Sequence, residues 1–560
     1  MTQRSLATLI RNRFEQRFDA PQITLWRRKE DSIDLSGRDL LARAEAMQAR
    51  WQALFGDNRC RFILALPTGE AFLTALLAGI LGRHTVVPVA IPRLGTKASR
   101  IGHIARDCGP HAILCLGSHA DTIRQSMGRA APCPILAIDD DTIKALPNHP
   151  RTENTAEPPT IIQYTSGSTR LPKGVALYDA QIIANCGLVE KVWDMNPNSC
   201  VVNWLPHYHD MGLMGGILYP LLSGGRSVQM SPLDMVRRPV DWLRAISEHK
   251  ATFSGGPAFA FAECLRRISP EDCAGLDLSN WVRAFCGAEP IPAGLLPDFQ
   301  NRFAQYGLAR ESVFGCYGMA EITLFAAGAP GSDDLRDPPT GCEAVAPCRL
   351  TELTAPLLRI VDPDTGANLP DGSAGEIWLA GPSKAAGYIN LPNDTRSVFH
   401  ATLRDPAESD AEWLRTGDIG VVSDGLLYVT GRIKDTLIAN GLKVSAAEVE
   451  WLAASVSDAL NPLAAAAFMA DRAQGAGAVL LIELIKGGPL TVDCTALCQA
   501  IERLAFGEWG IRLLDVRILP RGDLPRTTSG KIRRQFIAEA YHNGAYRSAQ
   551  NDLQTTELTE

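Results

Sequence analysis

Residues 163–175, QYTSGSTRLPKGV, combine glycine, several hydroxyl side chains and one lysine, which is the composition of a phosphate-binding loop. The stretch follows the apolar residues Ile161 and Ile162, so it is expected to leave the end of a strand. It is not a P-loop, because in that pattern a serine or threonine follows the lysine. Here Gly174 follows Lys173, and all the hydroxyl groups precede the lysine. If this stretch is taken alone, an ordinary surface turn is its simpler interpretation.

Five further short segments carry the glycines, acids and cations that chemistry between ATP and a carboxylate needs. They are CGAEPI (286–291), FGCYGMAE (314–321), WLRTGDIG (413–420), GRIKD (431–435) and LPRTTSGKIRR (524–534). Each segment alone is weak evidence for such chemistry, since TGD can be a plain turn and a lysine in a polar loop is usually a solvated surface residue. Their order and spacing along the chain are more informative than any one of them.

In this order the segments resemble the acyl-adenylate-forming superfamily, which includes acyl-CoA synthetases, adenylation domains of peptide synthetases and luciferases. The resemblance covers about residues 10–535. It implies an enzyme that uses ATP and Mg²⁺ to convert a carboxylic acid to acyl-AMP, with release of pyrophosphate. A P-loop kinase is disfavoured by the position of Lys173.

The resemblance also implies roles for individual residues. The residues of the loop that would hold the β- and γ-phosphates are Thr165, Ser166, Gly167, Ser168, Thr169 and Lys173. Those that would form the adenine and ribose site are Gly287, Ala288, Glu289, Tyr317, Gly318, Asp418 and Arg432. Those that would be catalytic are Thr165, Glu321 and Lys531. Glu321 would also coordinate Mg²⁺, a hard cation that suits a carboxylate.

Lys531 would be the central cation of the reaction. A carboxylate that attacks an α-phosphate brings two anions together, and a positioned ammonium group offsets their repulsion. Lys434 matches the hinge position, at which a mobile C-terminal domain swings between adenylation and thiol transfer. The resemblance therefore implies two domains, residues 1–433 with the ATP and acyl pocket and residues 434–560 with the catalytic lysine.

Three features are similar to the fatty acyl-AMP ligases within this superfamily: Arg170 after the Ser-Thr pair, the segment 203–225 (NWLPHYHDMGLMGGILYPLLSGG) and the segment 375–390 (GEIWLAGPSKAAGYIN). These ligases pass the acyl group to the phosphopantetheine thiol of a holo-acyl carrier protein, on a route to a polyketide- or lipopeptide-type product. The segment between Phe325 and Val361, however, is shorter than is expected for these ligases, and NGLKVSAAEVE (440–450) resembles the corresponding loop of CoA ligases.

Two alternatives therefore stay open. The first is a fatty acyl-CoA ligase that uses free CoA as the acceptor. The second is a catalytically silent protein that binds acyl-adenylate, which the presence of Lys531, Glu321 and Asp418 disfavours.

The acyl pocket is expected near His209, which the neighbouring Asp210 would orient. The residues expected to bind the acyl group are His209, Met214, Gly215 and Met319. The apolar or small residues Met214, Gly215 and Met319 suit a medium or long aliphatic acid better than an amino acid, although periodicity alone would also place them in the core.

The expected fold class is α/β, with a large N-terminal domain of mostly parallel, helix-covered sheets and a small α+β C-terminal domain. Between residues 60 and 330, short β-branched runs alternate with amphipathic stretches, which predicts βαβ units. The net charge of -7 gives no electrostatic case for nucleic acid or an anionic membrane surface. The fourteen scattered cysteines and the absence of an apolar leader or membrane span favour a cytoplasmic protein.

Overall fold

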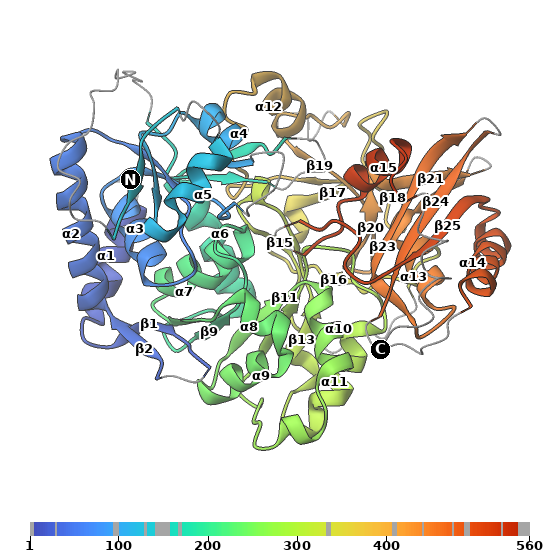
Figure 1. The fold of residues 1–560 in the computed structure, drawn as a ribbon, viewed down its shortest axis with the longest axis horizontal. Helices are drawn as coiled ribbons and strands as arrows, with labels where there is room; N and C mark the ends of the chain where they lie inside the picture. Colours follow the sequence, from blue (N-terminus) through green and yellow to red (C-terminus); the bar gives the residue numbers. More distant parts are fainter. Residues whose placement is uncertain are drawn as a thin grey trace.

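The structure is a computed structural model that describes residues 5–28, 31–92, 100–127, 132–139, 157–165, 171–331, 338–405, 411–439, 442–472, 475–485, 493–527 and 530–546. A large N-terminal region contains the seven-, six- and five-stranded sheets and one two-stranded sheet, and a smaller C-terminal region lies at one side of it (Figure 1). The two regions agree with the expected division into a large domain and a separate C-terminal domain.

Two mixed sheets form the centre of the N-terminal region. The first contains, in spatial order, β13 (Val313–Gly315), β12 (Arg283–Cys286), β11 (Phe253–Gly256), β9 (Cys200–Asn203), β10 (Arg226–Gln229), β1 (Pro21–Leu25) and β2 (Ile33–Ser36). The second contains β6 (Ile135–Ala137), β5 (Ala112–Cys115), β3 (Arg61–Leu64), β4 (Thr85–Pro88), β7 (Ile161–Tyr164) and β8 (Gly174–Leu177). All pairs are parallel except β1 with β2 and β7 with β8, so the predicted parallel βαβ organisation is confirmed.

Successive side chains of a strand point to opposite faces of the sheet, and this divides the apolar side chains among three cores. In β3, Phe62 and Leu64 pack into a core shared by both sheets, while Ile63 faces the opposite side. The helices of the shared core are α1 (Leu6–Gln16), α2 (Gly37–Phe55), α3 (Glu70–Leu81), α6 (Asp179–Trp193) and α7 (Tyr219–Leu222). The outer face of the second sheet is covered by α4 (Arg100–Cys108) and α5 (Gly117–Met127). The outer face of the first is covered by α8 (Pro232–Arg237), α9 (Pro239–Glu248), α10 (Ala258–Arg267) and α11 (Leu295–Phe303).

A third, antiparallel sheet connects the two regions of the chain. Its strands, in spatial order, are β16 (Cys348–Arg349), β20 (Leu426–Arg432), β19 (Leu414–Ser423), β18 (Ala374–Leu379) and β17 (Leu358–Val361). The helix α12 (Pro392–Phe399) lies against β19, and the short hairpin β14 (Tyr317–Gly318) and β15 (Phe325–Ala327) precedes the sheet.

The C-terminal region is an α+β unit with a core on each face of its sheet. Its strands are β23 (Leu460–Arg472), β24 (Gly475–Leu484) and β25 (Leu513–Leu519), preceded by the hairpin β21 (Thr436–Ala439) and β22 (Leu442–Ser445). One face packs on α13 (Ala446–Ala454) and α14 (Cys494–Trp509), and the other on α15 (Arg534–His542). Among the described helices, none is both long and apolar enough to cross a membrane.

Ser445 and Glu448 have the S-x-x-E spacing of a capping box but make only part of it. Its side chain accepts a hydrogen bond from the Ala447 N–H at 3.3 Å and donates to the Thr430 carbonyl at 2.6 Å. Its backbone N–H donates to Glu448, which therefore caps the start of α13.

Candidate active site

The carboxyl ends of four neighbouring parallel strands meet at one edge of the first sheet, which is where open α/β folds bind ligands. The segments that follow these strands carry most of the predicted site. His209 follows β9, Phe259 follows β11, residues 287–289 follow β12, and Tyr317 follows β13. The loop after β7 leaves the second sheet at Thr165.

The turn after β12 is shaped by tight backbone contacts. Gly287 packs so closely that a Cβ there would lie 2.5 Å from the Cys316 carbonyl oxygen, and Ala288 has a left-handed φ of 73°. Glu289 accepts a hydrogen bond from the Phe259 N–H at 3.4 Å. Burial raises the pKa of Glu289, and the nearby Lys531 ammonium opposes this rise.

Tyr317, Asp418 and Arg432 form one hydrogen-bonded group. Asp418 and Arg432 face each other on the antiparallel pair β19 and β20, which brings Nε of Arg432 to 2.8 Å from Oδ1 of Asp418. The Tyr317 hydroxyl donates to Oδ2 of Asp418 at 2.7 Å. Gly318 has no room for a side chain, since a Cβ there would lie 1.7 Å from the Leu324 carbonyl oxygen. The structure thus joins three residues that lie far apart in sequence.

The part of β19 that carries Asp418 is held by the buried Glu376 of β18. Its Oε1 accepts the Gly417 N–H at 3.0 Å, and its Oε2 accepts Nε and Nη2 of Arg415 at 3.0 and 2.8 Å. The Trp378 indole N–H donates to the same Oε2 at 2.9 Å. Gly417 has a φ of 72°, which explains why glycine precedes Asp418.

We expect Glu376→Ala to destabilise the protein by about 3 kcal/mol, because it leaves Arg415 and the Gly417 N–H without their buried acceptor. The midpoint of chemical denaturation measures this loss. The exposed Glu311→Ala is the matched control and should leave the midpoint unchanged. An unchanged midpoint in the Glu376 variant would contradict the anchoring role.

Glu321 lies beside the loop that contains Lys173. The Tyr388 hydroxyl donates to Oε1 of Glu321 at 2.8 Å. The ammonium of Lys173 lies 4.9 Å from the centre of the Tyr388 ring and 2.6 Å from Oδ2 of Asp394. Burial raises the pKa of Glu321, and the Tyr388 hydrogen bond and Arg432 oppose this rise. Lys173 is therefore held by α12 in this structure.

The phosphate-loop residues Ser166, Gly167, Ser168 and Thr169, together with Arg170, lie outside the described residues. The described base of the loop is closed by the Thr165 N–H, which donates to the Lys173 carbonyl at 3.0 Å. Nη2 of Arg100 donates to the Thr165 carbonyl at 3.2 Å, and Nε2 of His103 donates to the Pro172 carbonyl at 3.2 Å. Helix α4 therefore holds both ends of the loop.

Lys531 reaches the site from the C-terminal domain. Its backbone N–H donates to the Thr527 hydroxyl at 3.0 Å, and its carbonyl accepts the Thr527 N–H at 2.7 Å. Gly530 has a φ of 89°, and a Cβ there would lie 3.1 Å from the Phe259 ring, so this loop rests on the N-terminal domain.

The electrostatic surroundings of Lys531 come from the N-terminal domain. Burial and the neighbouring Arg432 lower the pKa of Lys531, while the carboxylates of Glu289, Asp210 and Asp418 oppose this change. These three carboxylates stand on three separate segments. The two domains are therefore arranged with the lysine at the predicted adenylate site.

His209 and Asp210 precede a π-helix, η1 (Met211–Leu218), which contains Met214 and Gly215. Nδ1 of His209 lies 2.6 Å from Oδ1 of Asp210. Burial alone would raise the pKa of Asp210. The neighbouring His209 and Lys531 outweigh this effect of burial, so the pKa of Asp210 is lowered.

The residues expected to contact the acyl chain differ in exposure. Met214 is fully buried in the shared core, a Cβ on Gly215 would lie 3.3 Å from Leu324, and Met319 is partly buried against the same core. The predicted hinge residue Lys434 is exposed in the 3-10 turn η8 (Ile433–Asp435), between β20 and β21.

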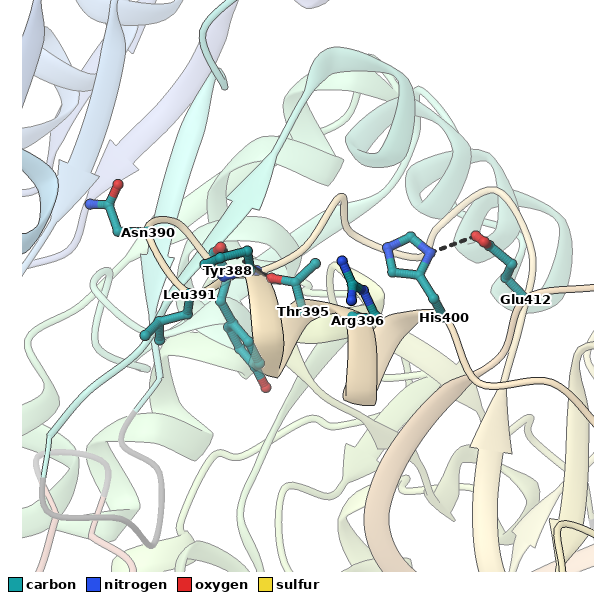
Figure 2. Close-up of a pocket in the computed structure, with 8 residues that line it drawn as sticks. Tyr388, Asn390, Leu391, Thr395, Arg396, His400 and Glu412 are labelled. Carbon is teal, nitrogen blue, oxygen red and sulfur yellow. Dashed lines mark hydrogen bonds and ion pairs between the residues drawn. The ribbon is translucent and has the colours of Figure 1, made fainter.

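A cavity of about 560 Å³ is lined by residues of α12 and of the segments that flank it (Figure 2). The residues that line it are Tyr388, Asn390, Leu391, Pro392, Thr395, Arg396, His400 and Glu412. Nδ1 of His400 pairs with Oε2 of Glu412 at 2.7 Å. None of the sequence-predicted site residues lines this cavity, so we do not assign it to the adenylation chemistry.

Several residues at the site were missed by the sequence analysis. Arg100 and Asp394 contact predicted site residues from helices that carry no motif. Glu376, within the segment 375–390, instead contacts Gly417, the neighbour of Asp418. Tyr388 lies within the segment 375–390, but nothing in its spacing indicated a contact with Glu321.

Comparison with known proteins agrees with this geometry. Residues 11–389 match the family described as AMP-binding enzyme. The long-chain-fatty-acid–AMP ligase FadD26 of Mycobacterium bovis is 32% identical, over 98% of this chain and 99% of that protein. The putative fatty-acid–CoA ligase FadD21 of Mycobacterium tuberculosis is also 32% identical, over 89% and 90% of the two chains. The crystal structure of fatty acyl-adenylate ligase from L. pneumophila in complex with acyl adenylate and pyrophosphate has a TM-score of 0.69, with 28% identity and 97% coverage of both chains.

The chain therefore belongs to the AMP-binding enzyme family, whose members form adenylates from ATP. Within that family it is a fatty acid–AMP ligase, which activates a fatty acid to acyl-AMP. This confirms the resemblance on which the sequence analysis relied.

Proposed function

We propose that the enzyme transfers the acyl group of its adenylate to the phosphopantetheine thiol of a holo-acyl carrier protein. We also propose that Lys531 drives the preceding adenylation step. The role of Lys531 is supported by the packing of its loop on Phe259 of the N-terminal domain, and by the carboxylates of Glu289 and Asp418, which oppose the lowering of its pKa. Acyl transfer to a carrier protein is supported by the segments 203–225 and 375–390, which are similar to those of the fatty acyl-AMP ligases.

In the first half-reaction, a carboxylate oxygen of the fatty acid attacks the α-phosphorus of ATP. The bond from that phosphorus to the oxygen bridging the α- and β-phosphates breaks, and pyrophosphate leaves. The ammonium of Lys531 offsets the repulsion between the carboxylate and the phosphate. Asp418 accepts hydrogen bonds from the ribose hydroxyls, and Tyr317 stacks on the adenine ring. The backbone of the turn after β12 lines the adenine site; its residues are Gly287, Ala288 and Glu289.

In the second half-reaction, the carrier thiol attacks the acyl carbon, loses its proton and displaces AMP. We assign Lys434 to the hinge that moves the C-terminal domain between the two half-reactions. An exposed short turn between two hairpins can change its backbone angles without disturbing a core. We place the enzyme in the cytoplasm, where both ATP and carrier proteins are present.

The chemistry of Glu321 fits a Mg²⁺ ion. Its Oε1 is oriented by the Tyr388 hydroxyl at 2.8 Å, and the carboxylate also accepts a hydrogen bond from its own backbone N–H. Those residues contain no group of three metal-ligating side chains, so most ligands would come from water and the phosphates. The ion, when bound, neutralises phosphate charge. Glu321 would hold it, and Tyr388 would stay a neutral donor, because burial and Glu321 raise the pKa of the Tyr388 hydroxyl.

We expect Glu321→Gln to raise the Mg²⁺ concentration for half-maximal acyl-AMP formation by about tenfold, because the amide lacks the negative charge. A magnesium titration of pyrophosphate release measures this shift. Glu311→Gln, on an exposed turn, is the matched control. A loss of rate with an unshifted titration would show that Glu321 does not bind the metal.

The acceptor and the acid are tested together in one assay. The enzyme is incubated with ATP, Mg²⁺ and fatty acids of increasing chain length, first with free CoA and then with a holo-carrier protein. Mass spectrometry follows acyl-AMP and thioester. We expect medium or long aliphatic acids to give acyl-AMP that persists with CoA and discharges onto the carrier. Efficient acyl-CoA formation would favour the alternative function, a fatty acyl-CoA ligase.

A further inference from the structure

The loop between β14 and β15 carries Glu321 and, two residues later, a residue with an unusual backbone. Glu321 lies in the 3-10 turn η5 (Ala320–Ile322), which Thr323 ends. Thr323 is fully buried and has a φ of 73° and a ψ of -56°. These are the angles of a γ-turn with positive φ, which is rare and strained, and a positive φ is a clear outlier for a β-branched residue. The surrounding contacts must therefore hold Thr323 in this conformation.

The pairing of the hairpin requires a sharp return of the chain at this point. β14 and β15 pair antiparallel, with Tyr317 opposite Ala327 and Gly318 opposite Phe325. The residues between Gly318 and Phe325 must form the turn η5 and still return to the partner strand. A reversal of direction at Thr323 makes this return possible within one residue.

The Thr323 side chain ties the turn to a distant segment. Its hydroxyl donates to the carbonyl oxygen of Ser383 at 2.7 Å, and both residues are buried. Its backbone N–H donates to the Ala320 carbonyl at 2.9 Å and closes the turn. Ser383 belongs to the segment 375–390, which is similar to that of the fatty acyl-AMP ligases. A buried carbonyl that loses its donor is costly, so this bond favours the strained conformation.

The same segment holds Glu321 at two further points. The Ala385 N–H donates to the Glu321 carbonyl at 2.9 Å, and the Tyr388 hydroxyl donates to Oε1 of its carboxylate at 2.8 Å. The segment 375–390 therefore fixes the backbone and the carboxylate of Glu321 and, through the Thr323 hydroxyl, the end of its turn. A change of the backbone at Thr323 moves Glu321 relative to these partners.

The two flanks of Thr323 are held by one buried amide on α6. Nδ2 of Asn185 donates to the Ile322 carbonyl at 3.3 Å and to the Phe325 carbonyl at 2.8 Å. Its Oδ1 accepts the Phe325 N–H at 3.0 Å. Strained residues persist where the surrounding structure fixes their neighbours in this way, and they cluster at functional sites.

We propose that Thr323 is a positioning residue for the metal: its strained backbone, held by the bond to Ser383, places the Glu321 carboxylate to receive Mg²⁺. Thr323 acts through Glu321, without contact to the ion or the substrates. Partners that orient a metal ligand commonly change the metal affinity when they are replaced. This inference rests on the proposed role of Glu321 as a Mg²⁺ ligand, and not on which thiol accepts the acyl group.

The test measures binding of Mn²⁺ by electron paramagnetic resonance to the full chain with a non-hydrolysable ATP analogue. Mn²⁺ accepts the same oxygen ligands as Mg²⁺, and its binding is read without turnover. Thr323→Ala removes the hydroxyl but keeps the Cβ that strains the backbone, so the turn should relax. We expect Mn²⁺ binding to weaken by about fivefold, the equivalent of one hydrogen bond.

Two further variants separate backbone strain from packing. Thr323→Gly also lacks the hydroxyl, but glycine adopts a positive φ without strain. It should therefore bind Mn²⁺ nearly as well as the unaltered protein, although it removes the whole side chain. Thr323→Ser keeps the hydroxyl bond and should also bind normally.

Thr85→Ala, on β4, is the matched control. It also loses a buried hydroxyl bond, which Thr85 donates to the Pro159 carbonyl at 2.6 Å. This variant should lower the midpoint of chemical denaturation and leave Mn²⁺ binding unchanged.

Unchanged Mn²⁺ binding in Thr323→Ala would overturn the proposal. Weak binding by folded Thr323→Gly would also overturn it, whether or not Thr323→Ala folds, because lost packing would then explain the effect. Glu321→Gln separates this inference from the proposed function. Weak binding in Glu321→Gln with normal binding in Thr323→Ala refutes only the role of Thr323. Normal binding in Glu321→Gln refutes the metal ligand itself, and this inference with it.

Discussion

Lys531→Ala should lower the rate of acyl-AMP formation by about 10²- to 10³-fold, the scale seen when one preorganised donor to a developing charge is removed. The ammonium is the cation that the C-terminal domain brings to three carboxylates of the N-terminal domain. Acid-dependent pyrophosphate release measures the loss. Transfer from chemically supplied acyl-AMP to a thiol should persist, because that step has no attack on phosphorus.

The loop around Lys531 should survive this substitution. Its hydrogen bonds to Thr527 come from the backbone, so removal of the side chain leaves them in place. Lys191→Ala, an exposed lysine on α6, is the matched control for loss of a surface charge. Adenylation at the normal rate in Lys531→Ala would remove the residue from the chemistry.

Lys434→Pro should leave adenylation nearly intact and slow thiol transfer by about a hundredfold, the cost of a small misplacement of reacting groups. Lys434 is the second residue of the turn η8, and Pro356 already occupies the second position of the 3-10 turn η6 (Ala355–Leu357). Proline therefore fits the arrangement seen here. It fixes φ, however, and so opposes rotation of the domain.

The two half-reactions are measured separately for this variant, as acyl-AMP in single turnover and as thioester formed from bound adenylate. Lys434→Ala removes the side chain without fixing φ and should transfer at the normal rate. Equal loss of both half-reactions in Lys434→Pro would contradict a hinge at this residue.

The parallel sheets could be predicted because β-branched runs such as RFIL (61–64) and CVVN (200–203) alternate with amphipathic helices. Strand β23 was missed, since it contains the run of alanines 464–467, and alanine has a low β propensity. Its alternate alanines enter two different cores, which only the tertiary structure shows.

The site could be predicted only where a residue belongs to a local motif. Tyr317, Asp418 and Arg432 each lie in such a segment, but their hydrogen-bonded group depends on the register of β19 with β20. Arg100 and Asp394 belong to ordinary amphipathic helices. Their contacts with the phosphate loop come from packing between distant segments, which spacing in one sequence does not encode.

We propose that this enzyme makes acyl-AMP for a carrier protein. Enzyme that holds radiolabelled acyl-AMP is freed of ATP by rapid gel filtration and mixed with either holo-carrier protein or free CoA. The rate of thioester formation is then followed by rapid quench. We expect fast transfer of the acyl group to the carrier protein, and we expect the acyl-AMP to stay intact in the presence of CoA. Transfer to CoA at an equal or higher rate would contradict it and identify the enzyme as an acyl-CoA ligase.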